Sequence, residues 1–334
     1  MKIAVIGAGA IGGLVAGYLK FKEADVSLVS RAQARDIIKQ KGIKISGARG
    51  NISVKIDVSD RLDYRPDLAI LAVKTQDVIK AIRDNSEFLK DAAILTVQNG
   101  VQADHIVARY IHKENIISSI IMFGSTSLSP GEINHNFEGD WIIGNLFSKN
   151  NKKVLEIRKV LESVFPIHVA ENIQGMKYLK IFVNSSNCFP AILGISMQEA
   201  FRNLNISRIS ISAWKEGLNV INSAGVKLES LPDFSLDRLA RLTALPTDEG
   251  AKIFSGIMVN LSREPLYGSI LQSIKRGRPS EIDYINGEFI RLARRNGTPV
   301  NLNVKLVEMV HQVEKSGKFF TKAELISSTK ELFD

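Results

Sequence analysis

The sequence predicts an α/β protein, in which an N-terminal Rossmann-type dinucleotide-binding domain is followed by an all-helical C-terminal domain. A short apolar run at residues 3–6 leads directly into a Gly-x-Gly-x-x-Gly motif and then a helical pattern. Apolar, strand-like runs alternate with helical stretches through the first half of the chain, and the strand signal fades after about residue 172. We therefore expect one domain at residues 1–171 and a second at 172–334.

The glycine motif predicts a phosphate-binding loop. Gly7 would allow a tight turn, Gly9 would let the backbone approach a pyrophosphate, and Gly12 would let helix and strand pack closely. The alternative is a structural turn without a ligand, which the strand–motif–helix context disfavours. The residues of this loop predicted to contact the cofactor are Gly7, Ala8, Gly9, Ala10, Ile11 and Gly12.

The composition favours a cytoplasmic enzyme. The 334 residues are 45% apolar and 24% charged, with a net charge of +9. The positive residues are scattered among acidic ones, which indicates a solvated surface rather than a nucleic-acid partner. Cys188 is the single cysteine, so no internal disulfide is expected. We expect no signal peptide, membrane span or metal site.

The first half reads as a series of buried parallel strands with helices between them. After the first strand, further strands are expected at Val26–Val29, Leu68–Val73, Ala93–Val97 and Ile116–Met122, with a helix over Gln76–Leu89. Antiparallel edge strands are expected around Pro130–Ile133 and Trp141–Gly144, followed by a helix over Lys152–Phe165 and a strand at Ile167–Val169. The second half predicts helices at 177–189, 207–224, 236–243, 268–275, 281–295 and 301–315. We expect the two domains to pack tightly and form a cleft.

The end of the second strand indicates which dinucleotide is bound. NAD enzymes usually carry an acidic residue there for the ribose 2′-hydroxyl, whereas NADP enzymes carry a basic group for the 2′-phosphate. Here the strand ends at Ser30 and Arg31, and Arg31 can pair with a phosphate. This predicts NADPH. In the alternative, Arg31 is an ordinary surface residue and another group such as Asp25 contacts the ribose, although Asp25 precedes the strand.

Three polar segments follow the strands of the predicted sheet. The three segments are Lys74-Thr75-Gln76, Gln98-Asn99-Gly100 and Phe123–Ser127. In this fold, loops at the carboxyl ends of the strands line the ligand crevice. Each segment alone could be a helix cap or a turn, but three at corresponding positions predict a polar site.

The second domain carries a polar stripe in an apolar segment. Lys180, Asn184 and Asn187 lie at helical spacing, so one helix face would present them together. A buried lysine is costly unless paired, and its pKa is easily shifted. The alternative is a stripe that faces solvent, and this segment alone does not decide between them. Further on, Glu281 could simply begin a helix, where a carboxylate is favourable.

These motifs together resemble the ketopantoate reductase (2-dehydropantoate 2-reductase) family over essentially the whole chain. The resemblance rests on the N-terminal GAGAIG, Val73-Lys74-Thr75, Gln98-Asn99-Gly100, the Lys180-x-x-x-Asn184 helix and the segment from Ser269 to Glu281-Ile-Asp-Tyr-Ile-Asn-Gly287. It implies NADPH-dependent reduction of a 2-keto acid on the route to pantothenate and coenzyme A. The implied chemistry is hydride delivery to the C2 carbonyl carbon while an ammonium stabilises and protonates the carbonyl oxygen.

The resemblance also implies roles for individual residues. Lys180 would be the general acid, and Glu281 would position the lysine or the cofactor. Substrate would be bound by Asn99, Asn184 and Ser269 as well as by Lys180. Cofactor contacts beyond the glycine loop would come from Ser30, Arg31, Lys74, Asn99, Ser127 and Glu281.

One position departs from the family pattern. Cys188 stands where the family usually carries a second asparagine, and Asn187 precedes it by one residue. An irregular turn before Pro190 would bring Asn187 into the substrate site, beside Asn184 in the cleft between the domains. Two alternatives remain: a reductase of another small 2-keto acid or β-hydroxy acid, and a non-catalytic NADP-binding sensor. The expected partner is a small-molecule 2-keto acid, with a homodimer as a further possibility.

Overall fold

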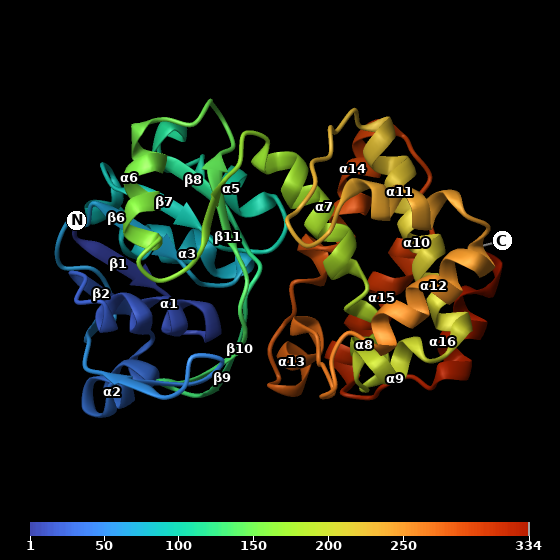
Figure 1. Ribbon diagram of the computed structural model, residues 1–334, viewed down its shortest axis with the longest axis horizontal. Helices are drawn as coiled ribbons and strands as arrows, with labels where there is room; N and C mark the ends of the chain where they lie inside the picture. The colour runs from blue at the N-terminus through green and yellow to red at the C-terminus, as the bar shows by residue number, and fades with distance from the viewer. Residues whose placement is uncertain (333–334) are drawn as a thin grey trace. The chain divides into compact units, whose positions relative to one another are not determined.

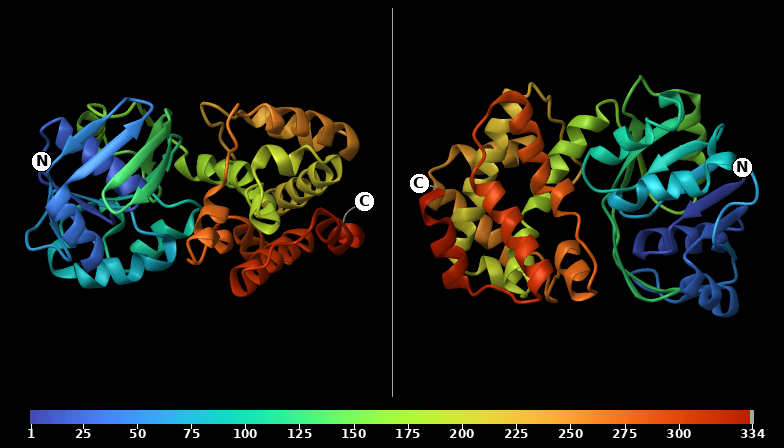
Figure 2. Two further views of the ribbon diagram at one scale, coloured as in Figure 1. Left: turned by 90° about the horizontal axis from the view of Figure 1, so that it is seen from below. Right: turned by 180° about the vertical axis from the view of Figure 1, so that it is seen from behind.

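The computed structural model describes residues 1–332 and divides into two compact units, Met1–Gln174 and Gly175–Asp334 (Figure 1). The first unit contains all the sheets found among the described residues. The second consists of helices and connecting loops, as both turned views show (Figure 2). The predicted α/β class with an all-helical second part is thus confirmed.

The main sheet of the first unit has eight strands among the described residues, in the order β12-β11-β8-β7-β6-β1-β2-β5. Neighbouring strands are parallel except for β8 and β11, which are antiparallel. Its central strands are short apolar runs buried on both faces, as parallel sheets require. The strands are β1 (Ile3–Ile6), β2 (Val26–Val29), β5 (Asp57–Ser59), β6 (Leu68–Leu71), β7 (Ala93–Thr96), β8 (Ile116–Ile121), β11 (Trp141–Asn145) and β12 (Ile167–Val169).

A second sheet was not predicted from the sequence. Its order is β4-β3-β10-β9, with β3 and β10 parallel and the other two pairs antiparallel. The prediction of edge strands around Pro130–Ile133 and Trp141–Gly144 was therefore wrong, because β10 is an inner strand of this sheet and β11 is an inner strand of the main sheet. The strands are β3 (Ile43–Gly47), β4 (Ile52–Val54), β9 (Gly124–Ser129) and β10 (Glu132–Phe137).

Helix α1 (Ala10–Phe21) packs against both sheets. A Cβ at Gly13 would lie 2.8 Å from Ile133 Cδ1, and one at Gly17 would lie 2.7 Å from Ile45 Cδ1. Only hydrogen at these two positions lets the helix approach the second sheet so closely. One apolar core thus joins residues of the main sheet, α1 and the second sheet.

The remaining helices of the first unit lie on the main sheet or at its edges. The predicted helix over Gln76–Leu89 is broken at Asn85, whose side chain accepts the Leu62 N–H at 2.7 Å and donates to Ala81 O at 2.8 Å. Such side-chain bonds compete with helix continuation. The helices are α2 (Ala32–Lys41), η1 (Thr75–Asp77), α3 (Val78–Asp84), α4 (Ser86–Leu89), α5 (Gln102–Val107), η2 (Lys113–Asn115) and α6 (Lys152–Leu161).

Two long helices predicted for the second unit are interrupted. The predicted helix at 177–189 ends at Ser185, and α8 begins at Cys188, because Pro190 has no N–H and its ring disfavours a continuous helix. The predicted helix at 281–295 divides into a 3₁₀ turn and α14 around Ile285, which has φ −112° and ψ −90°.

The helices beyond Gln174 also include several that the sequence pattern did not reveal, namely α9, α12 and α16. The complete set is α7 (Ile173–Ser185), α8 (Cys188–Leu193), α9 (Met197–Phe201), α10 (Leu204–Ser223), α11 (Leu236–Ala244), α12 (Thr247–Val259), α13 (Ser269–Lys275), η3 (Ile282–Tyr284), α14 (Asn286–Asn296), α15 (Leu302–Ser316), α16 (Lys322–Thr329) and η4 (Lys330–Leu332). No helix of the described part is both long and apolar enough to cross a membrane.

Candidate active site

The glycine loop has the geometry of a dinucleotide-binding turn. Gly7 has φ +117°, and a Cβ there would lie 2.7 Å from the carbonyl carbon of Ala72. A Cβ at Gly12 would lie 1.8 Å from the Gly7 carbonyl oxygen, so no side chain fits at either position. The first and third positions of the motif are therefore glycines because the loop packs too closely there to leave room for a side chain.

Gly9 differs, because a Cβ at this position would meet no atom within 4 Å. It is the N-cap residue of α1, which has no side-chain cap and no acidic residue in its first turn. Ala10 and Ile11 open the helix, and Ala8 connects it to Gly7. An open backbone surface at a helix N-terminus fits a pyrophosphate, whose charge the N–H groups and the helix dipole stabilise.

Ser30 and Arg31 follow β2. Ser30 is buried, and its N–H donates to Ser59 O at 2.9 Å, which extends the pairing of β2 with β5. Arg31 is the N-cap residue of α2, and its side chain is 80% exposed. Its guanidinium pairs with Asp77 Oδ2 at 3.0 Å. The cation therefore lies where the adenosine ribose is bound in this fold, with a carboxylate of η1 beside it.

The loops after β6 and β7 are tied together by a buried side chain. Gln98 donates from Nε2 to Leu71 O at 2.7 Å and to Val73 O at 2.8 Å. Lys74 then begins η1 as its N-cap residue, and Asn99 precedes Gly100, which has φ +77°. Ser127 lies farther along, in β9 of the second sheet. Gln98 thus acts as a structural brace that holds the positions from which Lys74 and Asn99 project.

Helix α7 carries the lysine of the polar stripe. Lys180 and Asn184 are four residues apart within one helix, so they share a face. Burial, together with the positive charge of Lys177, lowers the pKa of Lys180 to about 7. Lys177 itself is 2% exposed, and the sequence reasoning did not single it out. An ammonium with a pKa near neutrality is well matched to proton transfer at physiological pH.

Asn187 lies in the break between α7 and α8 and packs against the segment that carries Ser269. A Cβ on Gly268 would lie 2.7 Å from Asn187 Oδ1, so the amide sits directly on the Gly268 backbone. Gly268 is the N-cap residue of α13, whose first residue is Ser269. The predicted distortion before Pro190 is present, and Asn187 packs on Gly268, the residue that precedes Ser269 in the sequence.

Cys188 lies in the core of the second unit. It is fully buried, and Asn286 Nδ2 of α14 lies 3.9 Å from its sulfur. Burial raises the pKa of the Cys188 thiol well above its usual range. A neutral, enclosed thiol in the helical core has no surface to offer a substrate. The position that departs from the family pattern is therefore a core position in this chain.

Glu281 is the N-cap residue of η3 and is partly buried. Close to it in sequence, Glu288 is fully buried and accepts hydrogen bonds from Tyr178 at 3.2 Å and from Arg291. Burial raises the pKa of the Tyr178 phenol, and the charge of Glu288 raises it further. This network connects α7 to α14, and no sequence pattern revealed it. Among residues 1–332, no group of three or more His, Cys, Asp or Glu side chains could hold a metal ion.

Solved structures with this fold cover nearly the whole chain. A D-mandelate dehydrogenase in ternary complex with NADH and anilino(oxo)acetate has a TM-score of 0.81 at 24% identity, covering 95% of this chain and 99% of that one. A PanE/ApbA family ketopantoate reductase from Ralstonia eutropha JMP134 has a TM-score of 0.78 at 24% identity, over 94% and 99%. At these identities the likeness establishes the fold.

Curated relatives extend the comparison to sequence. The 2-dehydropantoate 2-reductase of Pyrococcus abyssi is 30% identical over 92% of this chain and 95% of its own length. That of Pyrococcus horikoshii is 29% identical over 95% and 99%. Fold, glycine loop and relatives together define an NAD(P)-dependent oxidoreductase that acts on a CH–OH group.

Two family models identify the family within that class. The model of ketopantoate reductase PanE/ApbA matches residues 3–147, and the model of its C-terminal domain matches residues 172–314. The chain belongs to the ketopantoate reductase family.

Proposed function

We propose that this protein reduces 2-dehydropantoate to pantoate with NADPH, in the cytoplasm. The observation that carries the proposal is Lys180, whose lowered pKa of about 7 makes it a proton donor near neutral pH on the same helix face as Asn184. The relatives named 2-dehydropantoate 2-reductase support the substrate. Arg31, an exposed cation that follows β2, supports NADPH.

The glycine loop, Ser30, Arg31, Lys74, Asn99 and Ser127 would hold the cofactor, with Glu281 contributing from the second unit. Bound NADPH would supply the hydride for the C2 carbonyl carbon. Lys180 would donate a hydrogen bond to the carbonyl oxygen and then give it a proton. Asn99, Asn184 and Asn187 would bind the polar groups of the keto acid, and Ser269 its carboxylate.

A different 2-keto acid is a second candidate, and Cys188 favours it. Because this residue is enclosed in the core, Asn187 is the neighbouring polar side chain that could contact the far end of the substrate. Its amide approaches from a displaced position against Gly268. A pocket with this geometry would fit a 2-keto acid whose distal group differs from the hydroxymethyl group of ketopantoate.

A substrate panel with matched variants tests the proposal. We expect 2-dehydropantoate to give the highest kcat/KM among small 2-keto acids. Lys180→Ala should lower kcat by about 10²- to 10⁴-fold, the usual contribution of a general acid, while NADPH affinity changes little. Lys252→Ala, on the exposed face of α12, is the control. Turnover of Lys180→Ala within a few-fold of the wild type would refute the assigned role.

A further inference from the structure

The segment that carries Glu281 needs support from outside itself. It runs from Ser280 to Tyr284, and its regular structure is a single 3₁₀ turn, η3, before the irregular Ile285. Short 3₁₀ turns have poor hydrogen-bond geometry, and isolated helical turns are unstable in water. Contacts that hold the neighbours of Glu281 therefore contribute to its conformation.

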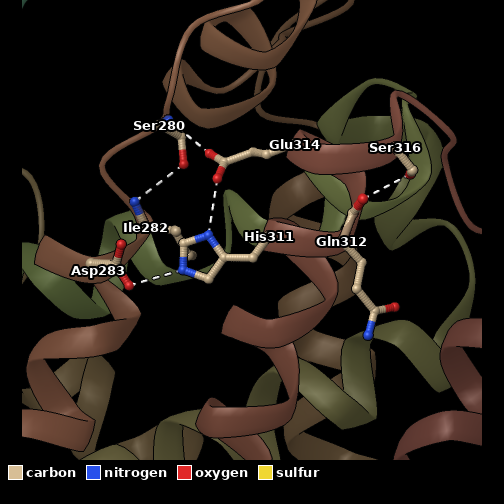
Figure 3. Close-up of polar contacts among 7 residues, drawn as sticks. All are labelled: Ser280, Ile282, Asp283, His311, Gln312, Glu314 and Ser316. Atoms are coloured by element: carbon tan, nitrogen blue, oxygen red, sulfur yellow. Dashed lines mark hydrogen bonds and ion pairs between the residues drawn. The ribbon is translucent and has the colours of Figure 1, made fainter.

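Side chains of α15 contact Ser280 and Asp283 (Figure 3), which precede and follow Glu281 in the sequence. On one side, the Ser280 N–H donates to Glu314 Oε1 at 2.7 Å, and Ser280 Oγ accepts from the Ile282 N–H at 3.3 Å. On the other side, Asp283 Oδ1 lies 3.0 Å from His311 Nε2. The two sides are joined, because His311 Nδ1 lies 2.9 Å from Glu314 Oε2.

This arrangement specifies the charge of the imidazole. Each ring nitrogen of His311 faces a carboxylate oxygen, and ionised carboxylates only accept hydrogen bonds. Both contacts can be hydrogen bonds only if both ring nitrogens carry a proton. A neutral ring would turn one lone pair towards a carboxylate, and that contact would be repulsive.

The electrostatics agree with this geometry. Burial lowers the pKa of His311, but hydrogen bonds and charges from Glu314 and Asp283 outweigh it, so the pKa is raised overall. The charged groups that act on the ring are Asp283 from η3 and Glu314 from α15 itself. Since the folded-state pKa is raised, the doubly bonded arrangement is complete below it and is lost as pH rises through it.

We propose that His311 is a positioning residue, which as an imidazolium between Asp283 and Glu314 holds the Ser280–Tyr284 segment and thereby orients Glu281. The inference rests on the proposed function in so far as Glu281 serves the reduction. The cluster is made of residues of the second unit, on α15, on η3 and just before η3. Its hold on the segment can therefore be measured apart from catalysis.

The first experiment measures hydrogen exchange of the segment in the full-length protein. Hydrogen exchange of residues 279–284 should be faster in His311→Gln than in the wild type, because glutamine has one donor nitrogen where the imidazolium offers two, one to each carboxylate. His112→Gln, a substitution of an exposed histidine in the first unit, should leave this exchange unchanged. NMR titration of His311 should give a midpoint above the ordinary value of about 6.5, and Asp283→Asn should lower it.

The second experiment connects the segment to turnover. His311→Gln should lower kcat by about tenfold, since small misplacements of catalytic groups cost up to about 100-fold. The KM for the keto acid should stay within about twofold, as expected when a transition-state interaction is lost. In the wild type, kcat should fall as pH rises through the His311 midpoint measured by NMR, and in Asp283→Asn this fall should move to lower pH together with that midpoint.

The outcomes separate this proposal from the proposed function. The positioning role would be overturned if hydrogen exchange of the segment is unchanged in His311→Gln. It would also be overturned if the exchange changes but kcat does not, while Glu281→Gln lowers kcat. If Glu281→Gln has normal turnover, the positioning role fails because Glu281 has no part in the reaction. If the wild type reduces no 2-keto acid, the proposed function fails, whereas the exchange and titration results still decide whether His311 holds the segment. Should His311→Gln fold poorly, Asp283→Asn provides the same tests from the other side of the contact.

Discussion

Replacing Arg31 tests the proposed preference for NADPH most directly. The Arg31 side chain is 80% exposed, and its guanidinium pairs with the Asp77 carboxylate at 3.0 Å. In Arg31→Ala, the 2′-phosphate would lose its charged hydrogen-bond donor. Hydrogen bonds to charged groups contribute about 1.5–3 kcal/mol, so NADPH binding should weaken by about 10- to 100-fold. NADH has no 2′-phosphate, and its binding should change little.

Removing the Asp77 carboxylate should change the affinity for NADPH by less, and in the opposite direction. The phosphate must take Arg31 from this carboxylate, and an exposed ion pair contributes about 0–1 kcal/mol. Asp77→Asn should therefore strengthen NADPH binding by at most about fivefold. An effect much larger than this would mean that Asp77 acts on the phosphate itself by repulsion.

Titration of both cofactors by nicotinamide fluorescence measures these changes. The matched control is Arg65→Ala, which removes an exposed arginine of the same unit that also pairs with a single aspartate, Asp91, at 3.7 Å. Equal affinities of the wild type for NADPH and NADH would refute the cofactor assignment. Equal weakening of both cofactors in Arg31→Ala would show that Arg31 does not read the 2′-phosphate.

Two further predictions concern the second unit. Since the folded-state pKa of Lys180 is lowered to about 7, the unfolded chain binds more protons between pH 7 and the ordinary lysine pKa of about 10.4, and stability rises with pH over that range. Lys180→Met should therefore raise Tm, with a gain that is largest below pH 7 and shrinks towards pH 10. The surface substitution Lys252→Met is the control. A gain in Tm that is independent of pH, or equal to that of the control, would contradict the explanation by a buried ammonium. Asn187→Ala should raise KM for the keto acid more than it lowers Tm, because the amide packs on Gly268 beside Ser269; unchanged KM with a large fall in Tm would show that this amide serves only packing.

Much of the first unit could be predicted because its signals are local. The central strands are apolar runs buried on both faces, and their composition alone distinguishes them from the helices between them. Gly7 and Gly12 could be interpreted because a backbone turn with no room for Cβ admits glycine only. The lysine and asparagine on one face of α7 followed from helical spacing.

The features missed depend on partners far away in sequence. Strand β3 pairs with β10, and no short-range pattern in either strand names its partner. The breaks at Asn85 and Ile285 also arise from tertiary contacts or local backbone geometry that override a helical pattern. Such elements acquire their form only when distant segments meet.

The sequence by itself determined the class of fold, the dinucleotide loop and the candidate catalytic helix, because each rests on neighbouring residues and one repeated period. Only the tertiary structure decided the environment of those residues. It showed that burial and Lys177 lower the pKa of Lys180, that Gln98 braces two strand ends, and that His311 and Glu314 hold the segment around Glu281. Burial, dielectric surroundings and long-range hydrogen bonds are properties of the packed chain, and they convert a pattern of residue types into specific chemistry.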